Sequence, residues 1–100
     1  MDRSNVIYLV EKTYATDAIK QRVPIESLRK VFCNIASVGQ SEFFAAGQAG
    51  LKPEYQITMF GPDYHGESEI ELSGTRYSIY RTYRRQDDNI ELYVQKRAGA

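Results

Sequence analysis

The stretch Ser41-Glu42-Phe43-Phe44-Ala45-Ala46-Gly47-Gln48 sets a short amphipathic segment inside a sequence that otherwise has the pattern of strands. It predicts one short helix. Ser37 opens a capping-box pattern and Ser41 is a rival N-cap, so either serine would begin the helix. Gly47 and Gly50 each weaken a helix by about 1 kcal/mol relative to alanine, and Lys52-Pro53 forces extended backbone. Inserts of this kind in small β domains often carry the function.

After the helix, apolar and polar side chains alternate over four segments separated by turn sequences. The expected strands are residues 55–60, 69–72, 75–84 and 90–96. Ser73-Gly74 predicts a tight hairpin, because such turns need positive φ. Strict alternation along residues 75–84 would place Tyr77, Ile79, Arg81 and Tyr83 on one face and Ser78, Tyr80 and Thr82 on the other.

Before the helix, residues 5–14 predict a strand covered on both sides, because Ile7 and Leu9 face one way and Val6, Tyr8 and Val10 the other. Pro24 cannot donate to a ladder, so a second strand is expected either to bulge there or to start after it. Residues 30–37 fit a strand that pairs back onto the first. A helix over residues 26–33 is the alternative.

Six strands in 100 residues predict an all-β fold, a small six-stranded antiparallel β barrel with one short inserted helix or loop, in a single domain over residues 1–100. Closure removes the exposed edges of an open sheet. Thirteen basic residues balance thirteen acidic ones, so there is no general attraction to nucleic acid or membrane. The single cysteine, the absence of a signal sequence and the absence of an apolar run of membrane-spanning length indicate a soluble, cytoplasmic protein.

Candidate chemical groups are few. Asp63, His65 and Glu67 share one turn, but with a single histidine and no second ligand cluster we interpret them as solvated turn residues. Cys33 alternates with Val31 and Ile35, which is typical of a small buried hydrophobe rather than a nucleophile. Glycine-rich phosphate loops are absent. The sequence therefore predicts no catalytic, cofactor or metal site, and a protein that is not an enzyme.

A second hypothesis comes from the arginines near the C-terminus. Arg81, Arg84 and Arg85 are interleaved with tyrosines, and cationic side chains beside stacking rings on a small barrel can hold single-stranded nucleic acid. Strict alternation, however, splits these residues between two faces, and acidic residues lie nearby. A small barrel that binds single strands, similar to an OB fold, therefore stays the alternative function.

The order of several motifs resembles the small head closure proteins (also called head completion or stopper proteins) of long-tailed bacteriophages. The motifs are Ser37-Val38-Gly39-Gln40-Ser41-Glu42-Phe43-Phe44-Ala45-Ala46-Gly47-Gln48, Leu51-Lys52-Pro53-Glu54, Phe60-Gly61-Pro62-Asp63-Tyr64-His65-Gly66-Glu67, Gly74-Thr75-Arg76-Tyr77-Ser78-Ile79-Tyr80-Arg81-Thr82-Tyr83 and Ile90-Glu91-Leu92-Tyr93. The likeness covers the chain from Asn5 onward.

The resemblance implies a structural virion protein of the head-tail connector, made in the cytoplasm of the host bacterium and without enzymatic activity. Such a protein closes the DNA-filled head and provides the surface for tail attachment. Implied partners are the portal and adaptor ring, tail-completion proteins, copies of the same chain in a ring and, without specificity, packaged DNA. No membrane is implied. Whether the chain seals the channel itself or mainly bridges to the tail stays open.

By the same resemblance, residues 40–53 map to the element that faces the central channel. The residues expected to face a partner or the channel are Gln40, Ser41, Glu42, Phe43, Phe44, Gln48, Leu51 and Lys52. The alternative is a purely structural role, in which Phe43 and Phe44 cover one mouth of the barrel.

Overall fold

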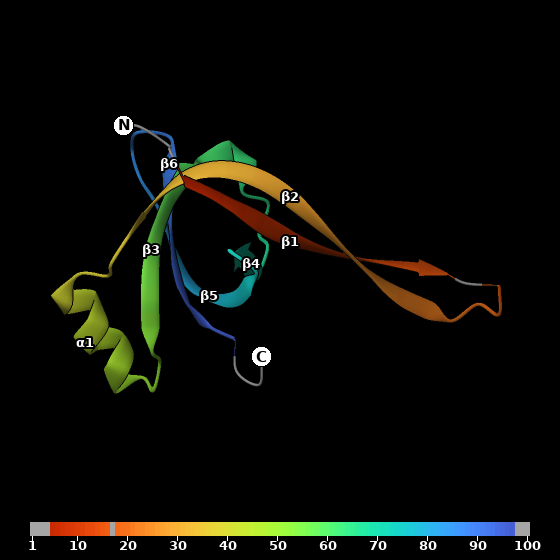
Figure 1. Ribbon diagram of the computed structural model, residues 1–100, viewed down its shortest axis with the longest axis horizontal. Coiled ribbons are helices and arrows are strands. Elements are labelled where there is room, and N and C mark those ends of the chain that lie inside the picture. The colour runs from red at the N-terminus through yellow and green to blue at the C-terminus, as the bar shows by residue number, and fades with distance from the viewer. Residues whose placement is uncertain (1–4, 17, 98–100) are drawn as a thin grey trace.

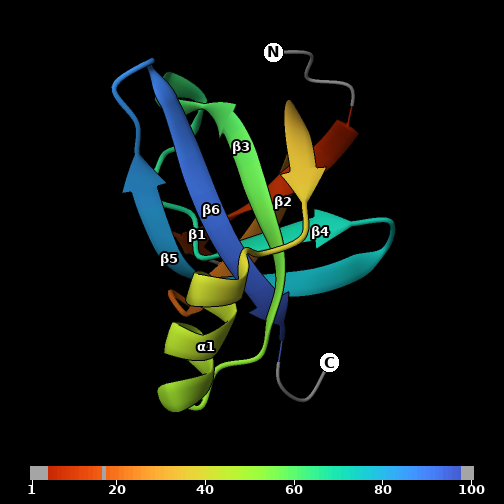
Figure 2. The same ribbon diagram turned by 90° about the vertical axis from the view of Figure 1, so that its left-hand side faces the viewer.

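A computed structural model describes residues 5–16 and 18–97 of the chain. In chain order the elements are β1 (Asn5–Thr16), β2 (Arg22–Ala36), α1 (Gln40–Gln48), β3 (Pro53–Phe60), the 3-10 turn η1 (Gly61–Asp63), β4 (Glu69–Leu72), β5 (Thr75–Arg84) and β6 (Asn89–Lys96). The strands form a closed antiparallel barrel in the order β1-β2-β3-β6-β5-β4 (Figure 2). The predicted six-stranded barrel with one short inserted helix is confirmed.

The barrel interior is filled by the apolar residues that alternate along each strand. Its fully buried side chains are Ile7, Leu9, Cys33, Ile57, Met59, Ile70, Ile90, Leu92 and Val94. The alternation predicted for β6 is confirmed, because Ile90, Leu92 and Val94 all face this core. Burial also raises the pKa of the Cys33 thiol to about 11. Cys33 is thus a small core hydrophobe, as its sequence pattern indicates.

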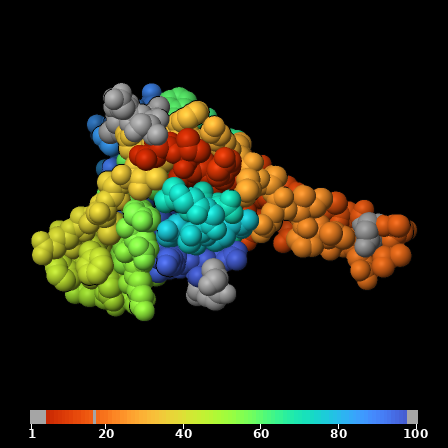
Figure 3. Space-filling model, viewed as in Figure 1, coloured from red at the N-terminus to blue at the C-terminus, as the bar shows by residue number. Residues whose placement is uncertain are grey.

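The most prominent feature outside the barrel is a long hairpin made by β1 and β2. The two strands pair from Asn5 with Cys33 to Thr16 with Arg22. β1 meets β4 only at Tyr8 and Leu9, and β2 meets β3 only from Cys33 onward. Residues 11–30, which we call the arm, therefore project from the barrel as a two-stranded ribbon (Figures 1 and 3).

The start of β2 differs from the sequence prediction. The strand begins at Arg22 and passes through Pro24, which pairs with Tyr14 without a bulge. The prediction that the strand bulges at Pro24 or starts after it is therefore wrong. The alternative of a helix over residues 26–33 is also wrong. A two-stranded ribbon leaves each strand with an outer edge that has no ladder partner, and proline is tolerated at such an edge.

β1 is covered on both sides only in part. Ile7 and Leu9 are fully buried in the barrel core, whereas on the opposite face Val10 is buried, Val6 is half-buried and Tyr8 is exposed. The outer face of an antiparallel strand can stay in contact with water. The predicted cover of both faces therefore holds at Val10 and fails at Tyr8.

The ends of α1 correct the predicted caps. The N-cap is Gly39, without a side-chain cap, so neither Ser37 nor Ser41 fills this role. At the other end, Gly50 has φ of +82°, the Leu51 N–H donates to the Ala46 carbonyl, and the Gly50 N–H donates to that of Gly47. This is the Schellman arrangement, in which glycine adopts the left-handed conformation just past the helix. The helix runs through Gly47, and Gly50 ends it.

A β-bulge interrupts β5 near its middle. Ile79 pairs with Val94 and Arg81 pairs with Tyr93, which leaves Tyr80 as the extra residue. A bulge of one residue shifts the alternation of all residues beyond it. The two-face assignment predicted for residues 75–84 is therefore wrong after Ile79.

Candidate interaction surfaces

The outer surface of α1 presents two neighbouring aromatic rings. Phe43 is 51% exposed and Phe44 is 59% exposed, and their centroids lie 6.0 Å apart in an edge-to-face arrangement. Ala46 is the buried residue of this helix. The two rings therefore form an exposed apolar patch on α1, whereas a lid over the barrel mouth would bury them.

Glu42 points the other way and holds α1 against the barrel. The Tyr80 hydroxyl donates to Glu42 Oε2 at 2.9 Å, and the Arg81 guanidinium forms an ion pair with Glu42 Oε1. Burial and the hydrogen bond to Glu42 raise the pKa of Tyr80. The bulge in β5 thus directs two successive side chains at one carboxylate on the inserted helix.

The other predicted residues of this segment divide between solvent and barrel. Gln40, Ser41, Gln48 and Lys52 are exposed, whereas Leu51 is half-buried. The Lys52 backbone N–H donates to the side-chain oxygen of Gln95 on β6 at 3.0 Å. Glu42 bonds to the barrel through Tyr80 and Arg81, and Leu51 is only partly exposed, so the fully exposed surface is smaller than the predicted set.

A stack of side chains supports this attachment. The Arg81 guanidinium lies 4.2 Å from the centroid of the Tyr93 ring, and the Tyr80 and Tyr93 rings are 6.3 Å apart. Tyr93 donates to Glu91 at 2.6 Å, and burial with this bond raises the pKa of Tyr93 to about 12. Cations over aromatic faces are stabilising, so the stack fixes the base of α1.

The three arginines proposed for nucleic-acid contact have different environments. Arg81 is paired with Glu42, and Arg85 is paired with Asp87 at 3.1 Å and with Glu91 at 3.8 Å. Arg84 is exposed at the end of β5. Carboxylate partners reduce the positive potential that a phosphate backbone needs.

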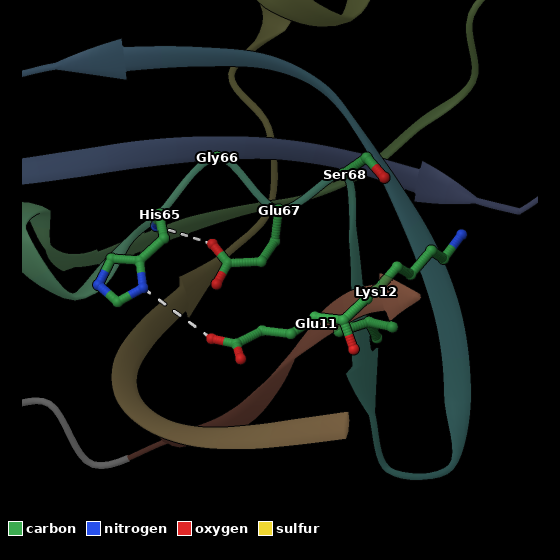
Figure 4. A pocket seen from close by; sticks show the side chains of 8 residues that line it. Glu11, Lys12, His65, Gly66, Glu67 and Ser68 are labelled. Carbon is green, nitrogen blue, oxygen red and sulfur yellow. Dashed lines mark hydrogen bonds and ion pairs between the residues drawn. The ribbon is translucent and has the colours of Figure 1, made fainter. Parts of the chain in front are cut away.

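An ionic cluster lies where the arm leaves the barrel. Arg29 on β2 donates through Nε to Glu11 Oε1 at 2.8 Å and through Nη2 to Glu67 Oε2 at 2.7 Å. His65 donates its backbone N–H to Glu67 Oε1 at 2.7 Å, and its Nδ1 lies 3.9 Å from Glu11 (Figure 4). The groove between β1 and this loop has a volume of about 400 Å³.

Glu67 corrects the prediction of a solvated turn. It is buried, and its carboxylate joins the loop to a strand 38 positions earlier in the chain. Burial raises the pKa of Glu67, but the hydrogen bonds from Arg29 and from backbone N–H groups outweigh this effect, so the pKa lies below its usual value. Asp63 is exposed, as expected for a turn residue.

The same cluster has the residue types of a metal site. Ligand atoms of Glu11, His65 and Glu67 all lie within 4.8 Å of one another. Arg29, however, already bonds both carboxylates, and a metal ion would have to displace it. A guanidinium is a permanent cation with a planar set of donors that fits carboxylates. The geometry therefore favours an ion-pair network that fixes the base of the arm.

A second ionic network holds the opposite face of the arm. Arg76 on β5 reaches Glu26 on the arm at 3.0 Å, and it also contacts Glu69 and Glu71 on β4. Lys12 on the arm reaches Glu69 at 3.3 Å. Exposed ion pairs contribute little singly, but a network with shared partners restricts geometry. The arm is thus fixed on both faces near the barrel.

The arm itself is a surface that sequence reasoning missed. Its apolar side chains lie in solvent, and Tyr14 is 60% and Ile19 is 70% exposed. Further exposed apolar residues on the arm are Val23, Ile25 and Leu28. The sequence signal was the presence of these residues in a segment otherwise rich in charge. A two-stranded ribbon is only marginally stable by itself, so such an arm gains from a partner.

Among the described residues, no helix is long and apolar enough to cross a membrane. No known protein-family model matches the chain, and a search of curated proteins finds no similar sequence.

Proposed function

We propose that this protein is a structural subunit of the head-tail connector of a long-tailed bacteriophage, where it closes the DNA-filled head and offers the tail its attachment surface. The order of motifs from Ser37 to Tyr93 supports this function by resemblance. The single structural observation that carries it is the placement of two exposed apolar projections, α1 and the arm, at opposite ends of one barrel (Figure 1).

A connector subunit must hold two different neighbours at a fixed spacing, and the barrel is suited to this task. Its closed ladder provides a rigid body. The Glu42 contacts fix one projection, and the Arg29 and Arg76 networks fix the other. Projections that are positioned in advance lose less conformational entropy on binding. Many modest contacts arranged in a ring then give a stable assembly.

Removal of the protein from an infection tests the proposal directly. The expected result is DNA-filled heads that leak DNA and do not join tails, because the surface between head and tail is missing. Electron microscopy of the particles and the amount of encapsidated DNA measure the two defects. The matched control restores the intact chain from a plasmid. Normal tailed particles without the protein would refute the proposed function.

Single-strand binding remains the competing function and makes a different prediction. We expect only weak, sequence-independent binding, because Arg81 and Arg85 already have carboxylate partners. Fluorescence anisotropy with a labelled oligonucleotide at two salt concentrations measures it. Sub-micromolar affinity at physiological salt that falls steeply with added salt, and falls again in Arg84→Ala, would favour the nucleic-acid function instead.

A further inference from the structure

The two outer edges of the arm are not equivalent. Tyr14 pairs with Pro24 in a ladder that runs unbroken from Asn5 to Thr16. Proline has no N–H, so it fits an unbroken antiparallel ladder only where its nitrogen faces away from the partner strand. The Pro24 nitrogen therefore faces outward from β2. The outer edge of β2 lacks a donor and carries a ring at this point, which disfavours the addition of another strand there.

The outer edge of β1 is open. Hydrogen bonding alternates along an antiparallel strand, so the pair of Tyr14 with Pro24 fixes the direction of the backbone groups on β1. The N–H and C=O groups of Lys12, Tyr14 and Thr16 point outward, in the direction in which Tyr8 meets β4. Beside Lys12 a groove of about 400 Å³ leaves room along this edge (Figure 4). Such a row of backbone groups can pair with an extended strand.

The sequence of this edge matches a second copy of itself. A two-fold axis at Thr13 sets Lys12 opposite Tyr14 of the second copy, so outward groups meet outward groups. It also sets the two threonines opposite each other, which is a favourable cross-strand pair. An axis at Lys12 would oppose two ammonium groups, which destabilises a pair. An axis at Tyr14 would shorten the pairing, because β1 ends at Thr16. One register therefore suits the edge best.

Both copies gain from the same contact. A two-stranded ribbon is marginally stable by itself, whereas a sheet of four strands has the number that independent stability needs. The arm projects from the barrel, so two antiparallel arms would place their barrels at opposite ends of the joined sheet (Figures 1 and 3). The charged groups nearest the groove already have partners, because Lys12 reaches Glu69 and Glu11 reaches Arg29. The contact therefore depends on the backbone and not on charge.

We propose that two copies of this chain join through the outer edges of β1 in their arms, antiparallel and with Thr13 at the two-fold axis, to form one sheet in the order β2-β1-β1-β2. This contact goes beyond the proposed connector function and does not depend on it. The interface is a pair of strand edges and buries little area, so the association is reversible and increases with protein concentration.

A disulfide at the axis tests the contact and its register with the pure full chain. In a non-hydrogen-bonded pair the Cα atoms lie about 4.5 Å apart, a separation that a disulfide spans. Thr13→Cys should therefore give a covalent dimer under mild oxidation. Ala15→Cys is the matched control, because Ala15 is exposed on the same face but lies at least about 13 Å from its copy in this register. It should stay monomeric. Cys33 is fully buried and does not take part.

A proline at position 14 tests the role of the backbone. Tyr14→Pro removes an outward N–H and leaves the hydrogen bonds to β2 in place, whereas Tyr14→Ala keeps the N–H. We expect Tyr14→Pro to weaken association, measured by sedimentation, on the order of tenfold, and Tyr14→Ala to weaken it much less. Circular dichroism shows that each variant is folded.

Hydrogen exchange of the original chain needs no substitution. The amides of Lys12 and Tyr14 should exchange more slowly as protein concentration rises, whereas the amide of Ile25, which faces β1, should not change. The proposal is overturned if Thr13→Cys and Ala15→Cys form covalent dimers equally, or if folded Tyr14→Pro associates as the original chain does. Exchange at Lys12 and Tyr14 that does not depend on concentration would also overturn it.

Discussion

Replacing both Phe43 and Phe44 by serine should abolish the joining of heads and tails while the melting temperature of the free protein stays nearly unchanged. Both rings are more than half exposed on α1, and the helix is attached through Glu42 and Ala46 instead. Burial of one such ring contributes roughly 1.5 to 3 kcal/mol by transfer estimates. The substitution removes this contribution from the contact with a partner and leaves the free energy of unfolding of the subunit unchanged. Because every subunit of a ring loses the same contribution, the total loss grows with the number of subunits.

Complementation of a particle-assembly defect and thermal melting by circular dichroism measure the two halves of this prediction. Tyr83→Ser is the matched control, because Tyr83 is an equally exposed aromatic residue on β5, away from α1. It should leave assembly intact. A double phenylalanine variant that melts many degrees lower would show that the rings belong to the fold and cover the barrel in solution.

Replacing Arg29 by leucine should give the largest loss of stability among surface-accessible side chains, about 2 to 4 kcal/mol at pH 7. Removal of one partner from a buried pair leaves an uncompensated charge, which costs roughly 3 to 5 kcal/mol when both are buried. The expected loss in free energy of unfolding is smaller here, because the Glu67 side chain is 4% exposed but that of Arg29 is 29% exposed. Urea denaturation measures the free energy of unfolding.

The pH dependence of this loss follows from the pKa of Glu67, which lies below its usual value in the folded protein. A depressed carboxyl pKa contributes stability above the pKa of the unfolded chain and loses it as pH falls through the folded pKa. The difference between the original chain and Arg29→Leu should therefore shrink in acid. Glu67→Gln with Arg29→Leu should recover much of the stability at pH 7. An equal difference at pH 7 and pH 3 would contradict the buried-pair explanation.

Much of the fold was predictable because most strands carry a clean local signal. β5 and β6 alternate apolar and polar residues between marked turns, and Ser73 and Gly74 both have the positive φ that a tight hairpin requires. Phe43 and Phe44 are exposed, and their role as partner-facing residues stays a prediction. Gly47 and Gly50 weaken the helix, and the two phenylalanines have no obvious apolar core to join. These local features indicated that the rings lie outside the core.

The features that escaped prediction depend on contacts between distant parts of the chain. The extra residue Tyr80 becomes visible only when β5 is aligned with β6. Burial of Glu67 depends on Arg29, and the inward turn of Glu42 depends on Arg81. The arm was missed because Pro24 suggested an interruption, whereas an unpaired edge accepts proline. Single-sequence patterns report local preference, and these positions are decided by tertiary partners.

The seam between β1 and β4 gives the barrel an uneven resistance to opening. Only Tyr8 with Glu71 and Leu9 with Ile70 pair there, whereas the β3 and β6 ladder runs from Pro53 to Phe60. Native proteins open first where the fewest interactions must break. A force applied to the arm would therefore break the short β1–β4 pairing before any other ladder. The barrel would then open between β1 and β4, and the six strands would stay hydrogen-bonded to one another as one open sheet.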